Sequence, residues 1–476
     1  MSATFRTTSR LVSVNTNGGA ANGASSSSVM SPDGRYVVFV SAASNLAPGT
    51  TNGIPNVFVR DLQAGTTTLA SPGAMPFSDA SSSGLPLVTP DGRYVTFFST
   101  ATNLVAGVTN SGEVYVRDLV NGITTWASSN AHSILQSFGK SNAFSCNEAM
   151  SDNGQMITYE ACPSAGAGVV LQYNLGTGLT EIVNTNVAGI LPGLELNDQN
   201  LSMTPDGRFV AFVSNGNGVN TGLAVWDGRS NTTAVVSEDA NHAAVTKASF
   251  DWPAITPDGR YVAFLSDATN LTASPAAPGF HLYVRDMQAG ADTLVDADTN
   301  GVGSMSNLMT FPSMSDDGGV VAFEALDGSL VPNDDNHAYD VFARNVAAGS
   351  TELISACLSG LPSATPNGSS FISSSSVSAN GQYVAYSSDA DNLVAEDTNG
   401  LRDVFVHDNL NGANLLVSMN TNGAPGNGFS SDPAISGNGR YVAFTSFPAI
   451  WRRMTPTTAR TCSCVICRPT QRPWSV

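Results

Sequence analysis

One nine-residue phrase recurs along the whole chain and limits what it can fold into. The phrase reads SPDGRYVVF at 31–39 and TPDGRYVAF at 256–264, and its eight copies place their turn glycines 52 to 63 residues apart. A fixed period of this length is typical of architectures in which each repeat is one supersecondary unit. The 476 residues are therefore better read as one large repeat domain than as several unrelated domains. The turn glycines are Gly34, Gly92, Gly154, Gly207, Gly259, Gly318, Gly381 and Gly439.

Two further phrases follow most copies, as in NVFVRDL at 56–62 and TTLAS at 67–71. A short stretch before each Asp-Gly or Asn-Gly turn supplies a fourth segment. These segments are rich in β-branched and aromatic residues and are bounded by Gly, Pro, Asn and Asp, which is typical of strands. Each repeat is therefore expected to contain four strands, A-turn-B-loop-C-turn-D.

The B strands are apolar on both faces. In the copy at 256–264, Tyr261 and Ala263 point to one side, and Val262 and Phe264 point to the other. A sheet that is apolar on both faces must be covered on both, and small sheets stacked around an axis achieve this. We predict an all-β propeller of about eight four-stranded blades, with seven as the alternative. RLVSV at 10–14 is expected to close the ring as the outer strand of the last blade.

The SPDGRYVAF-like phrase resembles the WD40-like PD40 repeat of the TolB-type β-propellers. The resemblance extends from about residue 10 to residue 447 and covers the propeller alone, because there is no room for the N-terminal α/β domain of a TolB protein. It implies a bacterial protein of the periplasm or the extracellular space. The first residues, MSATFR, have no apolar core, so no signal peptide is visible in this chain.

The last 30 residues depart from the repeat, so we divide the chain into a propeller at 1–446 and a tail at 447–476. When the codons are read in a shifted frame, residues 460–468 permit Asp-Val-Phe-Val-Arg-Asp-Leu-Gln, which is the missing C strand. The tail is therefore predicted to be a frameshifted remnant of the last blade. Its Cys462-x-Cys464-x-x-Cys467 spacing resembles a thiolate metal cluster, but this origin and the lack of a matching histidine favour no metal there.

Charge excludes several classes of partner. The net charge is −18, so a nucleic-acid backbone or an anionic membrane surface would be repelled. No run of 18 apolar residues is present to cross a membrane. Only 12% of residues are charged, but 42% are hydrophobic, which is enough for a sizeable core. We expect a monomer that binds a neutral or basic partner.

Signatures of catalysis are absent from the sequence. It contains no G-x-S-x-G nucleophile elbow and no H-E-x-x-H. The repeated Asp of the turn is expected to bond backbone amides, with Gly taking the positive φ. Propeller lyases for pectic fragments resemble this family and use histidines with a divalent metal, so histidines converging at the axis would favour an enzyme. His281 and His407 lie in or beside C strands, and His132, His242 and His337 lie in long loops. We expect solvated loop histidines and assign no catalytic, cofactor or metal residue.

Two acidic segments have the pattern Asp-x-Asn-x-x-x-Asp, at 334–340 and 397–403. Oxygen ligands at alternate positions suit Ca²⁺, but neither segment has the full EF-hand pattern. The first two blades have Thr50 and Val108 at the first position, so turn chemistry is favoured over a metal. Among the cysteines of the body, Cys146 and Cys162 can form a disulfide if they face each other on adjacent strands, and buried free thiols fit equally well.

Strand parity separates two faces of the disc. The A–B and C–D connections are tight turns on one face, and the longer B–C and D–A connections emerge on the other, which we call the long-loop face. Examples of its long segments are 45–55, 129–149, 272–280 and 356–376. Because binding residues gather on loops held by a rigid scaffold, we expect a non-catalytic TolB-like scaffold that binds a protein or a glycan through this face. The alternative is a propeller enzyme acting on polysaccharide, as a lyase or a glycoside hydrolase.

Overall fold

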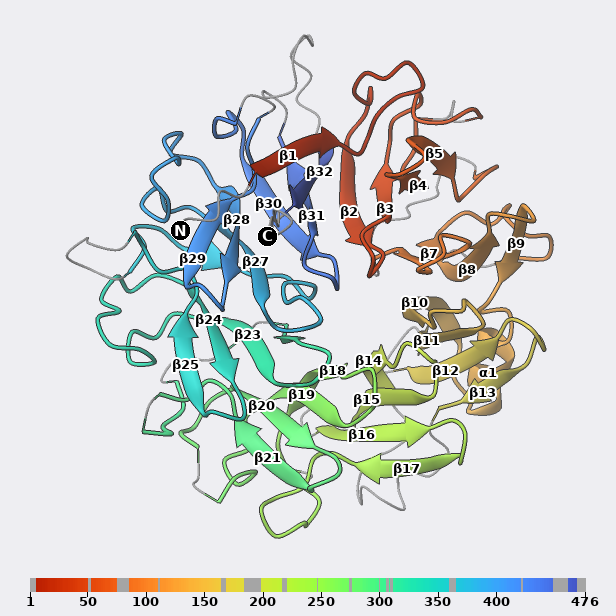
Figure 1. Ribbon diagram of the computed structural model, residues 1–476. Helices are drawn as coiled ribbons and strands as arrows, with labels where there is room; N and C mark the ends of the chain where they lie inside the picture. The colour runs from red at the N-terminus through yellow and green to blue at the C-terminus, as the bar shows by residue number, and fades with distance from the viewer. Residues whose placement is uncertain are drawn as a thin grey trace, which may run out of the picture.

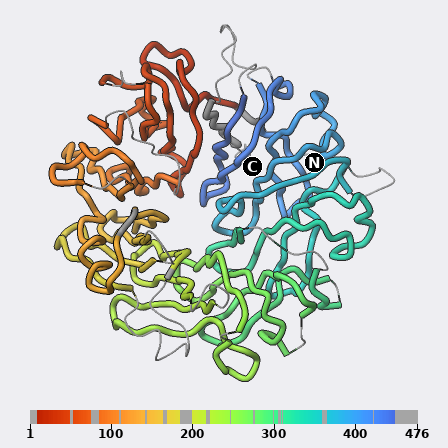
Figure 2. The backbone as a smooth tube through the Cα atoms, turned by 180° about the vertical axis from the view of Figure 1, so that it is seen from behind, coloured from red at the N-terminus to blue at the C-terminus, as the bar shows by residue number. Residues whose placement is uncertain are grey.

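The computed structural model describes residues 6–49, 53–74, 85–109, 112–163, 168–183, 198–215, 221–245, 247–273, 276–298, 300–304, 308, 311–358, 365–420, 423–447 and 461–468. These residues form eight four-stranded antiparallel sheets. Figures 1 and 2 show the sheets arranged radially around one axis, like the blades of a propeller. This confirms the prediction of an all-β propeller with about eight blades.

In seven of the eight blades, the strands run outward from the axis in chain order. The innermost strands are β2 (Ser25–Met30), β6 (Leu87–Val88), β10 (Asn142–Met150), β14 (Asp198–Met203), β18 (Phe250–Ile255), β22 (Ser313–Met314), β26 (Ser370–Phe371) and β30 (Ser430–Ile435). The second strands are β3 (Tyr36–Ser41), β7 (Tyr94–Ser99), β11 (Met156–Pro163), β15 (Phe209–Asn215), β19 (Tyr261–Ser266), β23 (Val320–Ala325), β27 (Tyr383–Ser388) and β31 (Tyr441–Ser446).

The two outer positions complete the blades. The third strands are β4 (Asn56–Asp61), β8 (Glu113–Asp118), β12 (Val169–Asn174), β16 (Thr221–Asp227), β20 (His281–Asp286), β24 (Asp340–Asn345), β28 (Asp403–Asp408) and β32 (Thr461–Arg468). The outermost strands are β5 (Thr66–Leu69), β9 (Ile123–Trp126), β13 (Thr180–Ile182), β17 (Thr232–Val235), β21 (Ala291–Leu294), β25 (Ser350–Leu353), β29 (Ala413–Leu416) and, for the eighth blade, β1 (Arg6–Leu11).

The eighth blade joins the two ends of the chain, because its strand order is β1-β32-β31-β30. The N-terminal strand therefore closes the ring as predicted, although it spans Arg6–Leu11 instead of 10–14. In the tail, β32 pairs with β31 so that Tyr441 lies opposite Ile466, just as Tyr383 lies opposite Asp408 in the seventh blade. Residues 448–460 and 469–476 of the tail lie outside the described residues, as do the side chains of its three cysteines. The frameshifted origin of this segment stays a prediction.

One α-helix is found among the described residues, α1 (Ala131–Ser137), in the connection between the second and third blades. It has seven residues, and no helix in the described part of the chain is long and apolar enough to cross a membrane.

The hydrophobic core lies between the blades. One cluster joins Val404 and Val406 of the seventh blade to Val442 and Phe444 of the eighth. Another joins Ala443 of the eighth blade to the first blade, so the apolar packing continues around the ring. Within the blades, stacked aromatic pairs link the second and third strands, with ring centroids 5.6 to 5.8 Å apart in Phe39–Phe58, Phe97–Tyr115, Phe264–Tyr283, Phe323–Phe342 and Tyr386–Phe405.

The repeated turn is built by its own polar side chains. In the first blade, Asp33 Oδ1 accepts hydrogen bonds from the Ser31 hydroxyl, at 2.6 Å, and from the backbone N–H of Arg35, at 3.0 Å. The Ser31 hydroxyl oxygen accepts the N–H of Tyr36 at 3.0 Å. The same bonds recur in the other blades, which confirms the structural reading of the repeated Asp.

The turn glycine is required by the neighbouring blade as well as by its own turn. Gly92 has φ 73°, and a Cβ at this position would lie 2.3 Å from the ring of Tyr36 in the preceding blade. The aromatic ring therefore occupies the space that the missing side chain leaves. The same contact joins Gly34–Tyr441, Gly154–Tyr94, Gly259–Phe209, Gly318–Tyr261 and Gly439–Tyr383.

The Arg of the repeated phrase holds the aromatic residue that follows it against its own blade. Arg260 forms an ion pair with Asp286 at 2.8 Å, and its guanidinium lies 4.8 Å from the centre of the Tyr261 ring. The hydrogen bond from Arg260 lowers the pKa of Asp286 to about 2. Equivalent ion pairs are Arg35–Asp61, Arg93–Asp118 and Arg208–Asp227.

We predict that Gly92→Ala destabilises the propeller much more than Gly107→Ala in the same blade. Both glycines have positive φ, but nothing lies within 4 Å of a Cβ at Gly107. Gly107→Ala should cost only the backbone strain, about 1 kcal/mol, and Gly92→Ala should add an overpacking cost of about 1–3 kcal/mol. Urea unfolding of both variants measures the difference, and equal losses would contradict the role given to Tyr36.

Candidate functional site

A cavity of about 700 Å³ lies on the propeller axis. Its described lining comes from the innermost segments of seven blades, which is why no single stretch of sequence reveals it. The lining residues are Ser27, Leu85, Leu87, Asn147, Glu148, Asn200, Leu201, Ser202, Trp252, Pro253, Ala254, Phe311, Pro312 and Ser374. The innermost strands run from the long-loop face to the tight-turn face. Ser27 is the third residue of β2, so this part of the channel lies about 7 Å below the long-loop end of the strand.

One position in each blade, the fourth residue before the Ser or Thr that opens the A–B turn, supplies half of this lining. We call these residues the axial ring: Ser27, Leu85, Asn147, Asn200, Trp252, Phe311, Ser374 and Asp432. In five innermost strands a β-bulge falls here, and Ser27, Asn147, Asn200, Trp252 and Asp432 have φ between 45° and 54°. Left-handed backbone is costly for residues other than glycine and clusters at functional sites.

The axial ring combines an aromatic wall with amide groups. The rings of Trp252 and Phe311 lie 4.3 Å apart between centroids, and Phe311 is 52% exposed. Asn147 Nδ2 donates to Glu160 Oε2 at 2.7 Å, and Asn200 Nδ2 donates to Asp251 Oδ1. The two carboxylates thus hold the amides in fixed orientations. An apolar wall with a few positioned polar groups is the usual composition of a ligand site.

Glu148 is a buried carboxyl group beside this cavity. Its side chain is buried, and neither carboxylate oxygen has a hydrogen-bond partner. Burial raises its pKa to about 7, although its own backbone amide and that of Phe98 act in the opposite direction. The carboxyl group is therefore largely protonated below neutral pH.

The channel continues toward the tight-turn face as a smaller cavity of about 200 Å³. Met203, Ile255 and Met314 narrow it there. The roomier part is therefore the one near the long-loop face.

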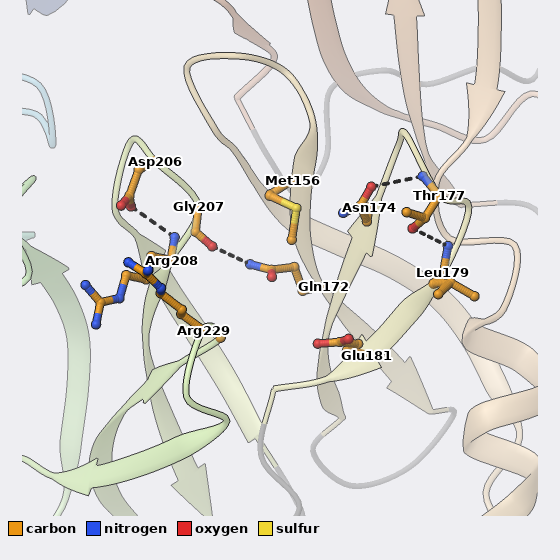
Figure 3. Close-up of a pocket in the computed structure, with 11 residues that line it drawn as sticks. Met156, Gln172, Asn174, Thr177, Leu179, Glu181, Asp206, Gly207, Arg208 and Arg229 are labelled. Atoms are coloured by element: carbon orange, nitrogen blue, oxygen red, sulfur yellow. Dashed lines mark hydrogen bonds between the residues drawn. The ribbon is translucent and has the colours of Figure 1, made fainter.

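A second hollow, of about 510 Å³, lies between the third and fourth blades on the tight-turn face. Figure 3 shows Gln172 donating to the carbonyl of Gly207, at 3.0 Å, with Arg208 and Arg229 on one side and Glu181 on the other. Here the third blade has Gln155-Met156 where most blades have Arg-Tyr or Arg-Phe, so Met156 replaces the aromatic ring. A similar hollow of about 530 Å³ lies between the fourth and fifth blades. Its recurrence indicates a property of the blade junctions, and we assign it no function.

The histidines do not meet at the axis, because none belongs to the described lining of the axial cavity. His281 and His407 lie in third strands, as expected, but both are buried instead of solvated. His281 Nδ1 lies 2.7 Å from Asp296 Oδ2, and His407 Nδ1 lies 2.9 Å from Asn414 Oδ1. His242 and His337 are exposed in loops, whereas His132 lies on α1 instead of in a loop.

Cys146 and Cys162 lie on the adjacent strands β10 and β11, where their Sγ atoms are 3.3 Å apart as free thiols. With Glu160 they form the one group of three metal-ligating side chains found in the described part of the chain. Sequence spacing did not suggest this grouping, because pairing of β10 with β11 brings the residues together. The hydrogen bond with Cys146 and burial raise the pKa of the Cys162 thiol, so this thiol favours the protonated, unreactive state.

Comparison with known proteins shows the fold alone. No family model and no curated protein matches the chain, so its resemblance to PD40 repeats stays a prediction. Similar solved structures include dipeptidyl peptidase 4 of Porphyromonas gingivalis, with 14% identity and a TM-score of 0.53 over 88% of this chain and 55% of that one. They also include TolB of Acinetobacter baumannii, with 15% identity and a TM-score of 0.32 over 59% of this chain and 57% of that one. An oligogalacturonate lyase in complex with manganese matches at 10% identity and a TM-score of 0.48, over 98% and 96% of the two chains.

The chain thus spans little more than half of the dipeptidyl peptidase and of TolB. At these identities the likeness supports a β-propeller and carries no activity or ligand across.

We predict that Glu148→Gln changes how stability depends on pH. The pKa of Glu148 is about 7 in the folded protein against a usual 4.5, so protonation favours the folded state. Its contribution is complete below pH 4.5 and is lost as the pH rises toward 7, for a total of about 3 kcal/mol. Glu148→Gln removes this loss, so the variant should gain stability relative to wild type between pH 5 and pH 8, as estimated from the two pKa values.

Urea unfolding at a series of pH values measures this effect. Glu181→Gln, at an exposed position, is the control and should follow wild type. A Glu148→Gln curve parallel to wild type would show that the carboxyl group has another partner.

Proposed function

We propose that this chain is a non-catalytic β-propeller scaffold that binds a protein or glycan partner through its long-loop face. The axial ring at the mouth of the channel is the proposed contact. The observation that carries this proposal is the pairing of the Trp252 and Phe311 rings beside oriented amides, in a cavity that opens on the axis. The periplasmic or extracellular location belongs to the same proposal.

A glycan suits this site better than a peptide. Aromatic rings offer a flat apolar surface for the C–H face of a sugar, and the amides of Asn147 and Asn200 can bond its hydroxyl groups. Glu160 and Asp251 stand directly behind these amides, and the chain carries a net charge of −18. An acidic polysaccharide would be repelled, so we favour a neutral or cationic glycan.

The enzyme alternative is the weaker one. It required two or three histidines with carboxylates at the axis, and the described lining contains serine, asparagine and aromatic residues instead. Glu148 is a buried acid with a raised pKa, but its oxygens are covered by protein and cannot reach a substrate in this conformation.

We predict that Phe311→Ser weakens glycan binding about tenfold, which is ~1.4 kcal/mol, because it removes half of the aromatic wall. A glycan array identifies ligands of the wild-type chain, and titration with the best of them gives the affinities. Leu410→Ser is the matched control, because Leu410 is 78% exposed in a C–D turn on the opposite face.

These measurements distinguish the two faces of the disc, and they distinguish a binding scaffold from an enzyme. Loss of binding in Leu410→Ser but not in Phe311→Ser would place the contact on the wrong face. Shortened or unsaturated products from the bound glycan would establish the enzyme alternative instead.

A further inference from the structure

Two buried carboxylates, in the B–C loops of the sixth and seventh blades, have oxygens that lack a hydrogen-bond partner. Asp397 is 4% exposed, and both its carboxylate oxygens are buried with no hydrogen-bond partner. Asp334 takes the same position one blade earlier, is 6% exposed, and leaves its Oδ1 without a partner. An ionised carboxylate is rarely buried in this way unless a cation lies beside it.

The Asn and the second Asp of each loop are hydrogen-bonded, in contrast to the first Asp. In the seventh blade, Asn399 Nδ2 donates to Asp403 Oδ2 at 2.5 Å and to the carbonyl of Gly426 at 2.6 Å. Asn399 Oδ1 accepts the N–H of Leu401 at 2.7 Å, and the Ser418 hydroxyl donates to Asp403 Oδ1. The Asn and the second Asp therefore form a bracket that shapes the loop around Asp397.

The sixth blade repeats this bracket bond for bond. Asn336 Nδ2 donates to Asp340 Oδ2 and to the carbonyl of Pro366, both at 2.9 Å. Asn336 Oδ1 accepts the N–H of Ala338 at 2.9 Å, and the Ser355 hydroxyl donates to Asp340 Oδ1 at 2.9 Å. Two independent loops with the same unpartnered carboxylate are harder to attribute to a local accident than one.

No basic side chain compensates the charge at Asp397. Burial and the nearby Asp391 raise its pKa. The backbone amide of Asn399, which lies outside hydrogen-bonding geometry for both oxygens, lowers it. At Asp334, burial, Asp335 and Asp327 raise the pKa, which the backbone amide of Asn336 and the exposed His337 lower. Each first Asp also raises the pKa of the second, Asp403 or Asp340, and both second residues are completely buried. Each loop thus concentrates negative charge in a region of low dielectric constant.

We propose that the B–C loops at 334–340 and 397–403 each bind one Ca²⁺ ion, with Asp334 and Asp397 as the anionic ligands. The available donors are carboxylate, amide and carbonyl oxygens, which favour a hard cation. Ca²⁺ accepts irregular oxygen coordination with loop carbonyls and water, whereas Mg²⁺ demands near-octahedral geometry. This inference does not depend on what the axial channel binds. The sequence alone favoured a purely structural role for these acidic loops, and this proposal replaces that interpretation.

The full chain, stripped with EGTA, tests the proposal by calorimetric titration with CaCl₂ and by thermal unfolding. We expect two sites per chain, with Kd on the order of 10⁻⁴ to 10⁻³ M, as for loop sites in extracellular modules. Millimolar Ca²⁺ should raise Tm, EGTA should reverse the rise, and Mg²⁺ at equal concentration should have a smaller effect. Absence of both the heat and the Tm shift would overturn the proposal.

Neutral variants locate the sites. Asp397→Asn should remove one of the two sites, and Asp334→Asn the other. Each should unfold at a higher temperature than wild type in EGTA, because an uncompensated buried charge is gone, and at a lower temperature in Ca²⁺, because one ion is lost. The adjacent exposed residues give matched controls, Glu396→Gln and Asp335→Asn, which should keep both sites.

A control variant that loses Ca²⁺ as completely as its buried neighbour would show diffuse attraction to acidic loops, and the proposal would fail. If one buried variant does not fold, the other still tests its own loop, because the two loops belong to different blades. The two proposals fail separately. Glycan binding in EGTA would not contradict the Ca²⁺ sites, and a chain that binds no Ca²⁺ can still bind a glycan at the axial ring.

Discussion

The ring is held together by an aromatic side chain of one blade that fills the space of a missing Cβ in the next. Tyr36 against Gly92 is one case, and Tyr441 against Gly34 makes the same contact where the last blade meets the first. A glycine in this turn thus has two roles. It adopts the positive φ of its own turn, and it leaves room for the aromatic side chain of the neighbouring blade. Where Met156 replaces the aromatic residue, its side chain takes the same place against Gly207. Regularity of the propeller therefore follows from how faithfully this pair is repeated.

Most of the fold could be predicted from the sequence, because the forces that make a blade are local. The Ser31-Asp33-Arg35 turn bonds within five residues, and the strands on either side are apolar and β-branched. The axial ring could not be predicted in the same way. Its members lie more than 50 residues apart in the chain, and the residues around Trp252 do not predict its left-handed backbone. Likewise the pattern at 397–403 shows oxygen ligands, but only packing shows that Asp397 is left without a partner.

Backbone strain and buried unpartnered charge both lie toward the long-loop face of the disc. The bulged axial ring carries backbone strain, and the loops at 334–340 and 397–403 carry buried charge. The tight-turn face, by contrast, is satisfied by ion pairs such as Arg260–Asp286 and by its turn bonds. A rigid base with unrelieved strain and charge on the opposite side is the arrangement expected of a scaffold that gains stability when something binds.

Pairing of β1 with β32 has a consequence for synthesis of the chain. Arg6 lies opposite Arg468, so β1 is made before the other described strands but finds its partner only after β32 is made. At ribosomal rates of 5–20 residues per second, this edge waits roughly half a minute or more while the other blades assemble. An unpaired strand edge invites association with other nascent chains. Newly made molecules should therefore be most prone to aggregate before β32 is made, and a holdase chaperone that covers residues 6–11 would improve their yield.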